Sequence, residues 1–211
     1  FPSHEHTPFI DGIPEGWEKK KLQEVARVKN GFAFKSKDYE SDGISLIRTK
    51  DFSSSKYINQ DEKVYIPYNL LDKYKKYLLN RYDFLLIMVG ASIGKFGIVL
   101  KKDLPALQNQ NMWAIHTINE HLYPQFYLIE TMKILIAKVM SHKIGSAREF
   151  FRKDFVNNQV ILLPSKFILD SFIDTVKPIY EQIENLVFQN QKLSQARDLL
   201  LPRLMNGEIT V

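Results

Sequence analysis

The 211-residue sequence contains no cysteine, which excludes disulfide bonds and thiolate metal ligands. Long apolar runs are also missing, because the longest, Phe84 to Val89, is far too short to cross a membrane. No segment has the pattern of a signal peptide. Together these absences favour a folded cytoplasmic protein that works away from any membrane.

Signatures of catalysis are equally scarce. None of the five histidines is spaced with another ligand type as a metal site requires. Gly90 to Lys95 is similar to a phosphate-binding loop, but its glycines are one residue too close and Phe96 replaces the metal-binding Ser or Thr. We interpret this stretch as a tight connection between two strands. Cofactor fingerprints, a nucleophile elbow and the acidic cluster of a two-metal nuclease are absent, which indicates a binding protein.

Short apolar segments separated by turn signals dominate the first three quarters of the sequence. They predict strands at residues 44–50, 83–89, 96–100, 112–117 and 160–163, and helices around 69–76 and 124–140. His116 falls in one of these strands, where a structural role is expected. Because helices and strands alternate irregularly, we predict a mixed α/β (α+β) globular domain. The predicted organisation is a flexible lead at 1–13, a globular domain at 14–164 and a long coiled-coil helix at 165–211.

The C-terminal helix is predicted from an apolar row with a period of 3.5 residues, sustained for more than four heptads. This period is typical of a coiled-coil seam, and the arm it predicts is about 50 Å long. The seam positions are Phe172, Val176, Ile179, Ile183, Leu186, Asn190, Leu193, Arg197, Leu200 and Leu204.

Two readings of this helix remain open from the sequence. A rod this long implies a partner helix, yet a second apolar row at Ile173, Tyr180 and Val187 would also suit a helix lying along its own domain. The seam is self-complementary about its midpoint, which favours an antiparallel pair. Pro178 predicts a kink or a boundary between two helices, and Gly207 predicts the C-terminal end.

Charge is distributed unevenly along the chain, whose net charge is +5. From Phe167 onward four basic and six acidic residues give −2, which leaves +7 for the remainder. A basic domain on a mildly acidic rod suggests a polyanion partner for the domain and a protein partner for the rod.

Four predicted loops mix basic, amide, hydroxyl and glycine residues, the types that contact phosphates and base edges in double-stranded DNA. Amides in particular pair bidentately with adenine. The candidate DNA-binding residues are Arg48, Lys50, Ser53 and Lys56; Ser92 and Lys95; Gln108, Asn109, Gln110 and Asn111; and Lys143, Gly145, Ser146, Arg148, Arg152 and Lys153.

Several stretches, taken in order, resemble the specificity (S) subunit of type I restriction–modification enzymes. The opening PEGWEKKKL at 14–22 resembles the start of a target recognition domain in that family. Three later stretches follow at 90–98, at 109–111 and at 145–164. The ending LSQARDLLLPRLMNGEI at 193–209 is the most specific of these similarities.

The resemblance implies that the domain recognises one half of a bipartite DNA site and that the helix pairs antiparallel with a second helix as a spacer. It also implies that methyltransferase (M) and restriction (R) subunits assemble on this scaffold. No cofactor is then expected in this chain, since S-adenosylmethionine, ATP and Mg²⁺ belong to those partners.

A complete subunit of that family carries two recognition domains and two spacer helices, whereas this sequence carries one of each. Two origins remain open: the C-terminal half of a longer subunit, or a half-subunit that forms a homodimer. Two other functions also remain as alternatives, namely a fragment of a fused methyltransferase or nuclease and a coiled-coil interaction protein with a basic domain.

Overall fold

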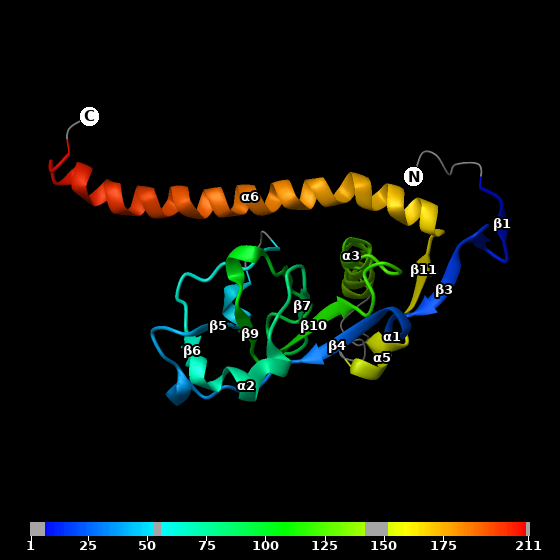
Figure 1. Ribbon diagram of the computed structural model, residues 1–211, viewed down its shortest axis with the longest axis horizontal. Coiled ribbons are helices and arrows are strands. Elements are labelled where there is room, and N and C mark those ends of the chain that lie inside the picture. Colours follow the sequence, from blue (N-terminus) through cyan, green and yellow to red (C-terminus); the bar gives the residue numbers. More distant parts are fainter. Residues whose placement is uncertain (1–6, 53–55, 142–151, 210–211) are drawn as a thin grey trace. The chain divides into compact units, whose positions relative to one another are not determined.

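Short strands in the first part of the chain assemble into two main sheets, as the computed structural model shows (Figure 1). The structure describes residues 7–52, 56–141 and 152–209. A four-stranded antiparallel sheet has the order β4–β10–β7–β8. Its strands are β4 (Ala26–Asn30), β10 (Met112–Thr117), β7 (Phe84–Ile87) and β8 (Phe96–Ile98).

The second sheet has three strands in the order β6–β5–β9, with β5 parallel to β9. These are β6 (Tyr65–Ile66), β5 (Ile44–Ile47) and β9 (Ala106–Gln108). Two smaller pairs complete the strands of the described residues. One joins β3 (Glu18–Lys21) to β11 (Val160–Leu163), and the other joins β1 (Phe9–Ile10) to β2 (Ile13–Pro14).

The two main sheets share one hydrophobic core. Ile47 of β5, Leu85 and Ile87 of β7, and Met112 and Ala114 of β10 belong to a single buried cluster. All four residues of β7 are fully buried, which explains its uninterrupted apolar sequence. The strands predicted at 112–117 and 160–163 are confirmed as β10 and β11, and the strand predicted at 83–89 is confirmed as the shorter β7.

Strand β5 is shorter than the sequence predicts, and it has no solvent face. Its four residues are all buried, and the backbone leaves the sheet after Ile47. The cause is a reciprocal turn in which Arg48 N donates to Asp51 Oδ2 at 2.8 Å and Asp51 N donates to Arg48 O at 3.0 Å. This turn opens the 3₁₀ helix η3 (Thr49–Asp51) where the prediction continued the strand to residue 50.

Helices cover the outside of the sheets. The predicted helix at 124–140 is confirmed as α3 (Gln125–Ser141), which contacts β10 and buries residues such as Phe126 and Ile129. The helix predicted near 69–76 consists of η4 (Tyr68–Leu70), α2 (Leu71–Tyr74) and η5 (Lys75–Tyr77). Further short helices among the described residues are α1 (Leu22–Val25), η2 (Ser36–Asp38), η6 (Lys101–Asp103) and α5 (Lys153–Asn157).

The segment before Pro14, predicted to be a flexible lead, contains the small β1–β2 hairpin. Asp11 and Gly12 form its turn with φ angles of 50° and 75°, as a two-residue hairpin connection requires. Glu15 N donates to Pro8 O at 2.8 Å and closes the base of the hairpin.

The chain ends in α6 (Lys166–Met205), a continuous helix of 40 residues. The long predicted helix is therefore confirmed, and the helix runs through Pro178 rather than ending there. At its C-terminus Gly207 has φ = 70°, Gly207 N donates to Leu204 O, and Glu208 N donates to Arg203 O. These two bonds form a Schellman motif, which confirms Gly207 as the end signal.

Two compact units divide the chain, one ending at Ile173 and the other beginning at Asp174. The first turns of α6 thus belong to the first unit, where Ile168 and Leu169 are buried. In the second unit, apolar seam residues such as Leu193 and Leu200 are exposed, by 67% and 47%. Within the described residues no helix has both the length and the apolar character needed to span a membrane.

Candidate nucleic-acid interface

The strand registers bring several of the predicted loops to one edge of the sheets. Asn30 at the end of β4 pairs with Trp113, and Ile87 at the end of β7 pairs with Met112 at the start of β10. Gln108 at the end of β9 pairs in parallel with Ile47 at the end of β5. We call this edge the loop edge, and it consists of the segments 48–52, 56–58, 88–95 and 109–111.

The turn of residues 109–111 lies at the centre of the loop edge because it connects β9 of one sheet to β10 of the other. Asn109 N donates to Ile47 O at 3.1 Å, and Met88 N donates to Asn111 O at 3.2 Å. The turn is therefore attached to the ends of both β5 and β7. Gln110 and Asn111 are exposed.

Gln108 was predicted to contact DNA together with residues 109–111, but it is buried. Its side chain is only 1% exposed, and Nε2 donates to Lys29 O at 3.0 Å. A side chain enclosed in this way does not reach DNA without unfolding the edge, so Gln108 belongs to the support of the turn and not to its surface. The sequence alone did not indicate this, because an amide in a polar run normally lies in solvent.

The connection between β7 and β8 carries Ser92 and Lys95. Gly94 N donates to Ile87 O at 2.9 Å and Lys95 N donates to Ser92 O at 3.0 Å, so the segment is the predicted tight turn. It joins two antiparallel strands and precedes no helix, which agrees with the rejection of a nucleotide-binding loop. A Cβ at Gly94 would lie 2.7 Å from Met140 Sδ, so the C-terminal end of α3 also reaches this turn.

The segment after β5 is held in place by two charged side chains, Arg48 and Asp51. Arg48 Nη2 donates to the carbonyl oxygen of Glu62 and lies 3.9 Å from Asp51 Oδ1. Burial raises the pKa of Asp51, against the opposing effects of the Arg48 N–H and of Gln60. Because the Arg48 side chain is only 16% exposed, its primary role is to hold the segment in place.

Two lysines of the first group lie closer to solvent. Lys50 donates to Glu62 Oε2, and this hydrogen bond lowers the pKa of Glu62. Both partners are well exposed, so a phosphate could replace the carboxylate at little cost. Lys56 Nζ lies 4.7 Å from the centre of the Phe96 ring, which stacks in turn on Phe84 at 4.9 Å.

The fourth predicted group is only partly described. Ser53 of the first group and Lys143, Gly145, Ser146 and Arg148 of the fourth lie outside the described residues. Arg152 and Lys153 are exposed at the start of α5. That helix contacts α1, and Gln159, which follows it, accepts the Leu22 N–H at 2.8 Å. Because α1 leads directly into Ala26, these contacts lie at the start of β4, away from Asn30. The structure therefore does not bring Arg152 and Lys153 to the loop edge.

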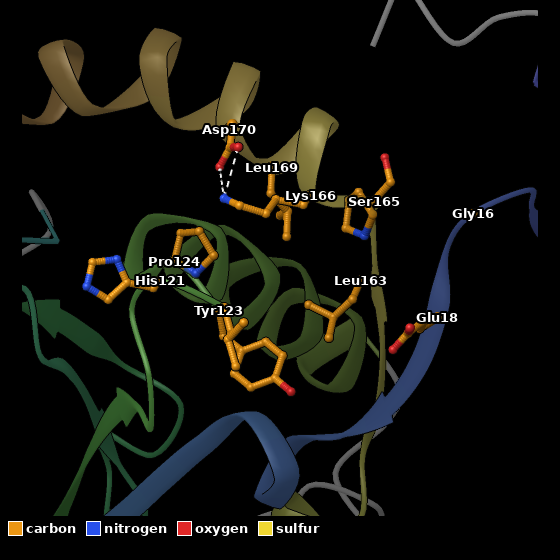
Figure 2. Close-up of a pocket in the computed structure, with 12 residues that line it drawn as sticks. Gly16, Glu18, His121, Tyr123, Pro124, Leu163, Ser165, Lys166, Leu169 and Asp170 are labelled. Atoms are coloured by element: carbon orange, nitrogen blue, oxygen red, sulfur yellow. Dashed lines mark hydrogen bonds and ion pairs between the residues drawn. The ribbon is translucent and has the colours of Figure 1, made fainter.

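A separate pocket of about 230 Å³ lies where β3, β11, α3 and α6 approach one another, and Figure 2 shows its lining. Lys166 Nζ contacts both carboxylate oxygens of Asp170, at 2.8 and 2.9 Å. Glu18, on the other wall, accepts from Lys20 at 3.2 Å. Each of these two carboxylates therefore already faces a lysine. In the part of the chain that the structure describes, none of the predicted DNA-binding residues lines it, and no group of three potential ligands could hold a metal ion.

A mixed α/β domain with polar loops gathered on one edge, followed in the chain by a long helix, is the architecture that the sequence predicts for a target recognition module. The chain belongs to the family of the type I restriction modification DNA specificity domain, whose family model matches residues 14–191. The resemblance found in the sequence is thereby confirmed.

Individual relatives support the assignment. The chain is 25% identical over 202 residues to the type I restriction enzyme MjaIX specificity subunit of Methanocaldococcus jannaschii, covering 94% of this chain and 46% of that protein. It is 32% identical over 113 residues to the EcoAI specificity subunit of Escherichia coli, covering 52% of this chain and 19% of that protein. The chain therefore spans about half the length of the curated relatives that it matches over most of its own length.

Solved structures show the same fold. The HsdS subunit from Thermoanaerobacter tengcongensis superimposes with a TM-score of 0.57 at 16% identity, over 98% of this chain and 49% of that one. The S subunit from M. genitalium gives a TM-score of 0.55 at 14% identity, over 90% and 46% of the two chains. The predicted architecture of a mixed domain followed by a long helix is thus that of known S subunits.

Proposed function

We propose that this chain is the sequence-recognition half of a type I restriction–modification specificity subunit, and that its loop edge reads one half of a bipartite site in double-stranded DNA. The observation that carries the proposal is the family match over residues 14–191, combined with the meeting of three predicted loop groups on one edge. Lys50, Lys56 and Lys95 supply contacts to phosphates, while Gln110 and Asn111 supply contacts to bases.

In this proposal the chain itself carries out no catalytic step. Methyltransferase subunits and a restriction subunit assemble on it and bind S-adenosylmethionine, ATP and Mg²⁺. Support comes from the relatives, which are specificity subunits of type I restriction enzymes.

The second unit serves as the spacer. We propose that the seam of α6 pairs antiparallel with a second helix, contributed either by another copy of this chain or by the other half of a longer subunit. The exposed apolar side chains at Leu186, Leu193 and Leu200 support this, since water-exposed leucines at seam spacing are stabilised by a partner. Two recognition domains held by such a pair would contact two half-sites.

Binding to duplex DNA of randomised sequence tests the proposal directly. The chain is mixed with the library, bound duplexes are recovered and sequenced over several rounds, and the affinity of the enriched duplex is measured across a range of salt concentrations. We expect one enriched motif and a steep fall in affinity with salt, because lysines at phosphates release counterions. Recovery of duplexes without any shared motif would contradict sequence recognition.

A further inference from the structure

The turn of residues 109–111 is fixed from beneath by the buried residue that precedes it. Gln108 donates through its side chain to Lys29 O at 3.0 Å and accepts Phe32 N–H on its backbone carbonyl at 3.2 Å. Both contacts reach residues flanking the end of β4, so the base of the turn is connected to a third strand besides β5 and β7.

Gly31 allows this attachment to be unusually close. A Cβ at this position would lie 1.9 Å from Asn109 O and 2.4 Å from the Asn109 carbonyl carbon, far inside any real contact. The obstacle is backbone and not the flexible end of a side chain. Gly31 is therefore needed for space, and any larger residue would push the Asn109 peptide out of its position.

The three amide side chains of the turn, those of residues 109–111, have two different roles. Asn109 Oδ1 accepts the Gln110 N–H at 2.6 Å, so the Asn109 side chain is used to shape the turn. Gln110 and Asn111 are exposed, and within the described part of the chain neither side chain has a partner. Two free carboxamides thus stand on a backbone that three strands hold in place.

We propose that Gln110 and Asn111 are the specificity-determining residues of this turn, that they read an adenine-containing base pair, and that Gly31 and Gln108 are positioning residues for them. This inference rests on the proposed function. A carboxamide donates and accepts in the geometry that matches N7 and the N6 amino group of adenine in the major groove. Such a bidentate contact requires a fixed backbone, and the Gly31–Asn109 approach provides it.

The test repeats the selection from randomised duplexes with the full chain and its variants. For Gln110→Ala and Asn111→Ala we expect the preference for adenine to fall about tenfold or more at one or two adjacent positions, with the rest of the motif retained. Gln182→Ala, an exposed amide on α6, is the matched control and should leave the motif unchanged.

The positioning residues are tested by Gly31→Ala and Gln108→Met. We expect both to weaken the preference at the same positions as Gln110→Ala, while binding to duplexes of unrelated sequence stays within about twofold, because phosphate contacts carry that binding. A merely structural role would instead lower the folded fraction and weaken binding to all sequences alike. Thermal melting of each variant separates these two results.

Three outcomes are distinct. Loss of preference at the expected positions supports the inference. An unchanged motif in both Gln110→Ala and Asn111→Ala, or a loss confined to a G·C pair, overturns it while leaving DNA recognition intact. If the unmodified chain enriches no motif, the proposed function itself fails.

Discussion

Nδ1 of His116 lies 2.7 Å from Oδ1 of Asp83, a carboxylate with no exposed surface. On the other side of the ring, Nε2 lies 3.1 Å from Glu120 Oε1. Burial lowers the pKa of His116, but the two carboxylates outweigh this effect and the net shift is upward. The histidine is thus a structural residue of β10, as its place in a predicted strand indicated.

The raised pKa of His116 makes its contribution to stability dependent on pH. When the pKa of a group is higher in the folded state than in the unfolded state, its charged form stabilises the fold. This contribution is complete at a pH below the unfolded-state pKa, which is about 6.5 for histidine, and it is lost as the pH rises through the folded-state pKa. We therefore expect the difference in unfolding free energy between the unmodified chain and His116→Gln to be largest near pH 6 and smaller near pH 9. Urea denaturation across this range measures it, and a difference that grows with pH would disprove the assignment.

Two glycines with positive φ should respond very differently to alanine. At Gly43, where φ is 139°, a Cβ would lie 2.3 Å from Ile66 O, so Gly43→Ala combines strain with a backbone clash and should cost about 3 kcal/mol. At Gly90, where φ is 83°, no atom lies within 4 Å, and Gly90→Ala should cost only about 1 kcal/mol. Chemical denaturation compares the two, and equal losses would show that the close approach at Gly43 relaxes freely.

Lys95 tests whether the β7–β8 turn contacts a phosphate. In the proposed complex Lys95→Ala should weaken binding to every duplex similarly and reduce the slope of log K against log salt by about one. Lys19→Ala is the matched control, because Lys19 is an exposed lysine on β3, away from the loop edge. Equal slopes for the unmodified chain and Lys95→Ala would remove this lysine from the interface.

Leu186 tests the spacer seam. The side chain is 49% exposed in the single chain, so Leu186→Lys should leave the first unit folded while placing a charge in the apolar seam. If α6 pairs with a second copy, the mass from light scattering should fall from dimer to monomer. Gln195→Lys adds the same charge at an exposed position opposite the seam and should keep the dimer. An unchanged mass in Leu186→Lys would contradict pairing through this seam.

Elements with a clear local pattern could be predicted from the sequence. The uninterrupted apolar run of β7 and the 3.6-residue period of α3 are properties of neighbouring residues, and both were found where expected. The end of α6 could also be predicted, because glycine readily adopts the positive φ angle that Gly207 has after the last helical turn. Of the two alternatives predicted at Pro178, a helix boundary is wrong, because α6 continues through both Pro178 and Pro202.

Long-range pairing could not be predicted in the same way. Gln108 resembles a surface amide until β9 is known to lie beside Ile47, and its bond to Lys29 O spans 79 positions of sequence. Arg48 resembles a phosphate ligand until Glu62 is known to fold back over it. The sequence therefore indicated three of the segments that meet at the loop edge, together with a fourth group whose Arg152 and Lys153 lie elsewhere. Only the structure separated the residues that hold these segments from those that face outward.

That separation has an evolutionary consequence. The loop edge is secured by the buried side chains of Asp51 and Gln108 and by the close backbone approach at Gly31, while its exposed tips at Lys95, Gln110 and Asn111 contribute little to the core. Substitutions at the tips therefore cost little folding free energy. Under the proposed function, successive variants can then acquire new target sequences while every intermediate remains folded. The same scaffold can acquire a different target one side chain at a time.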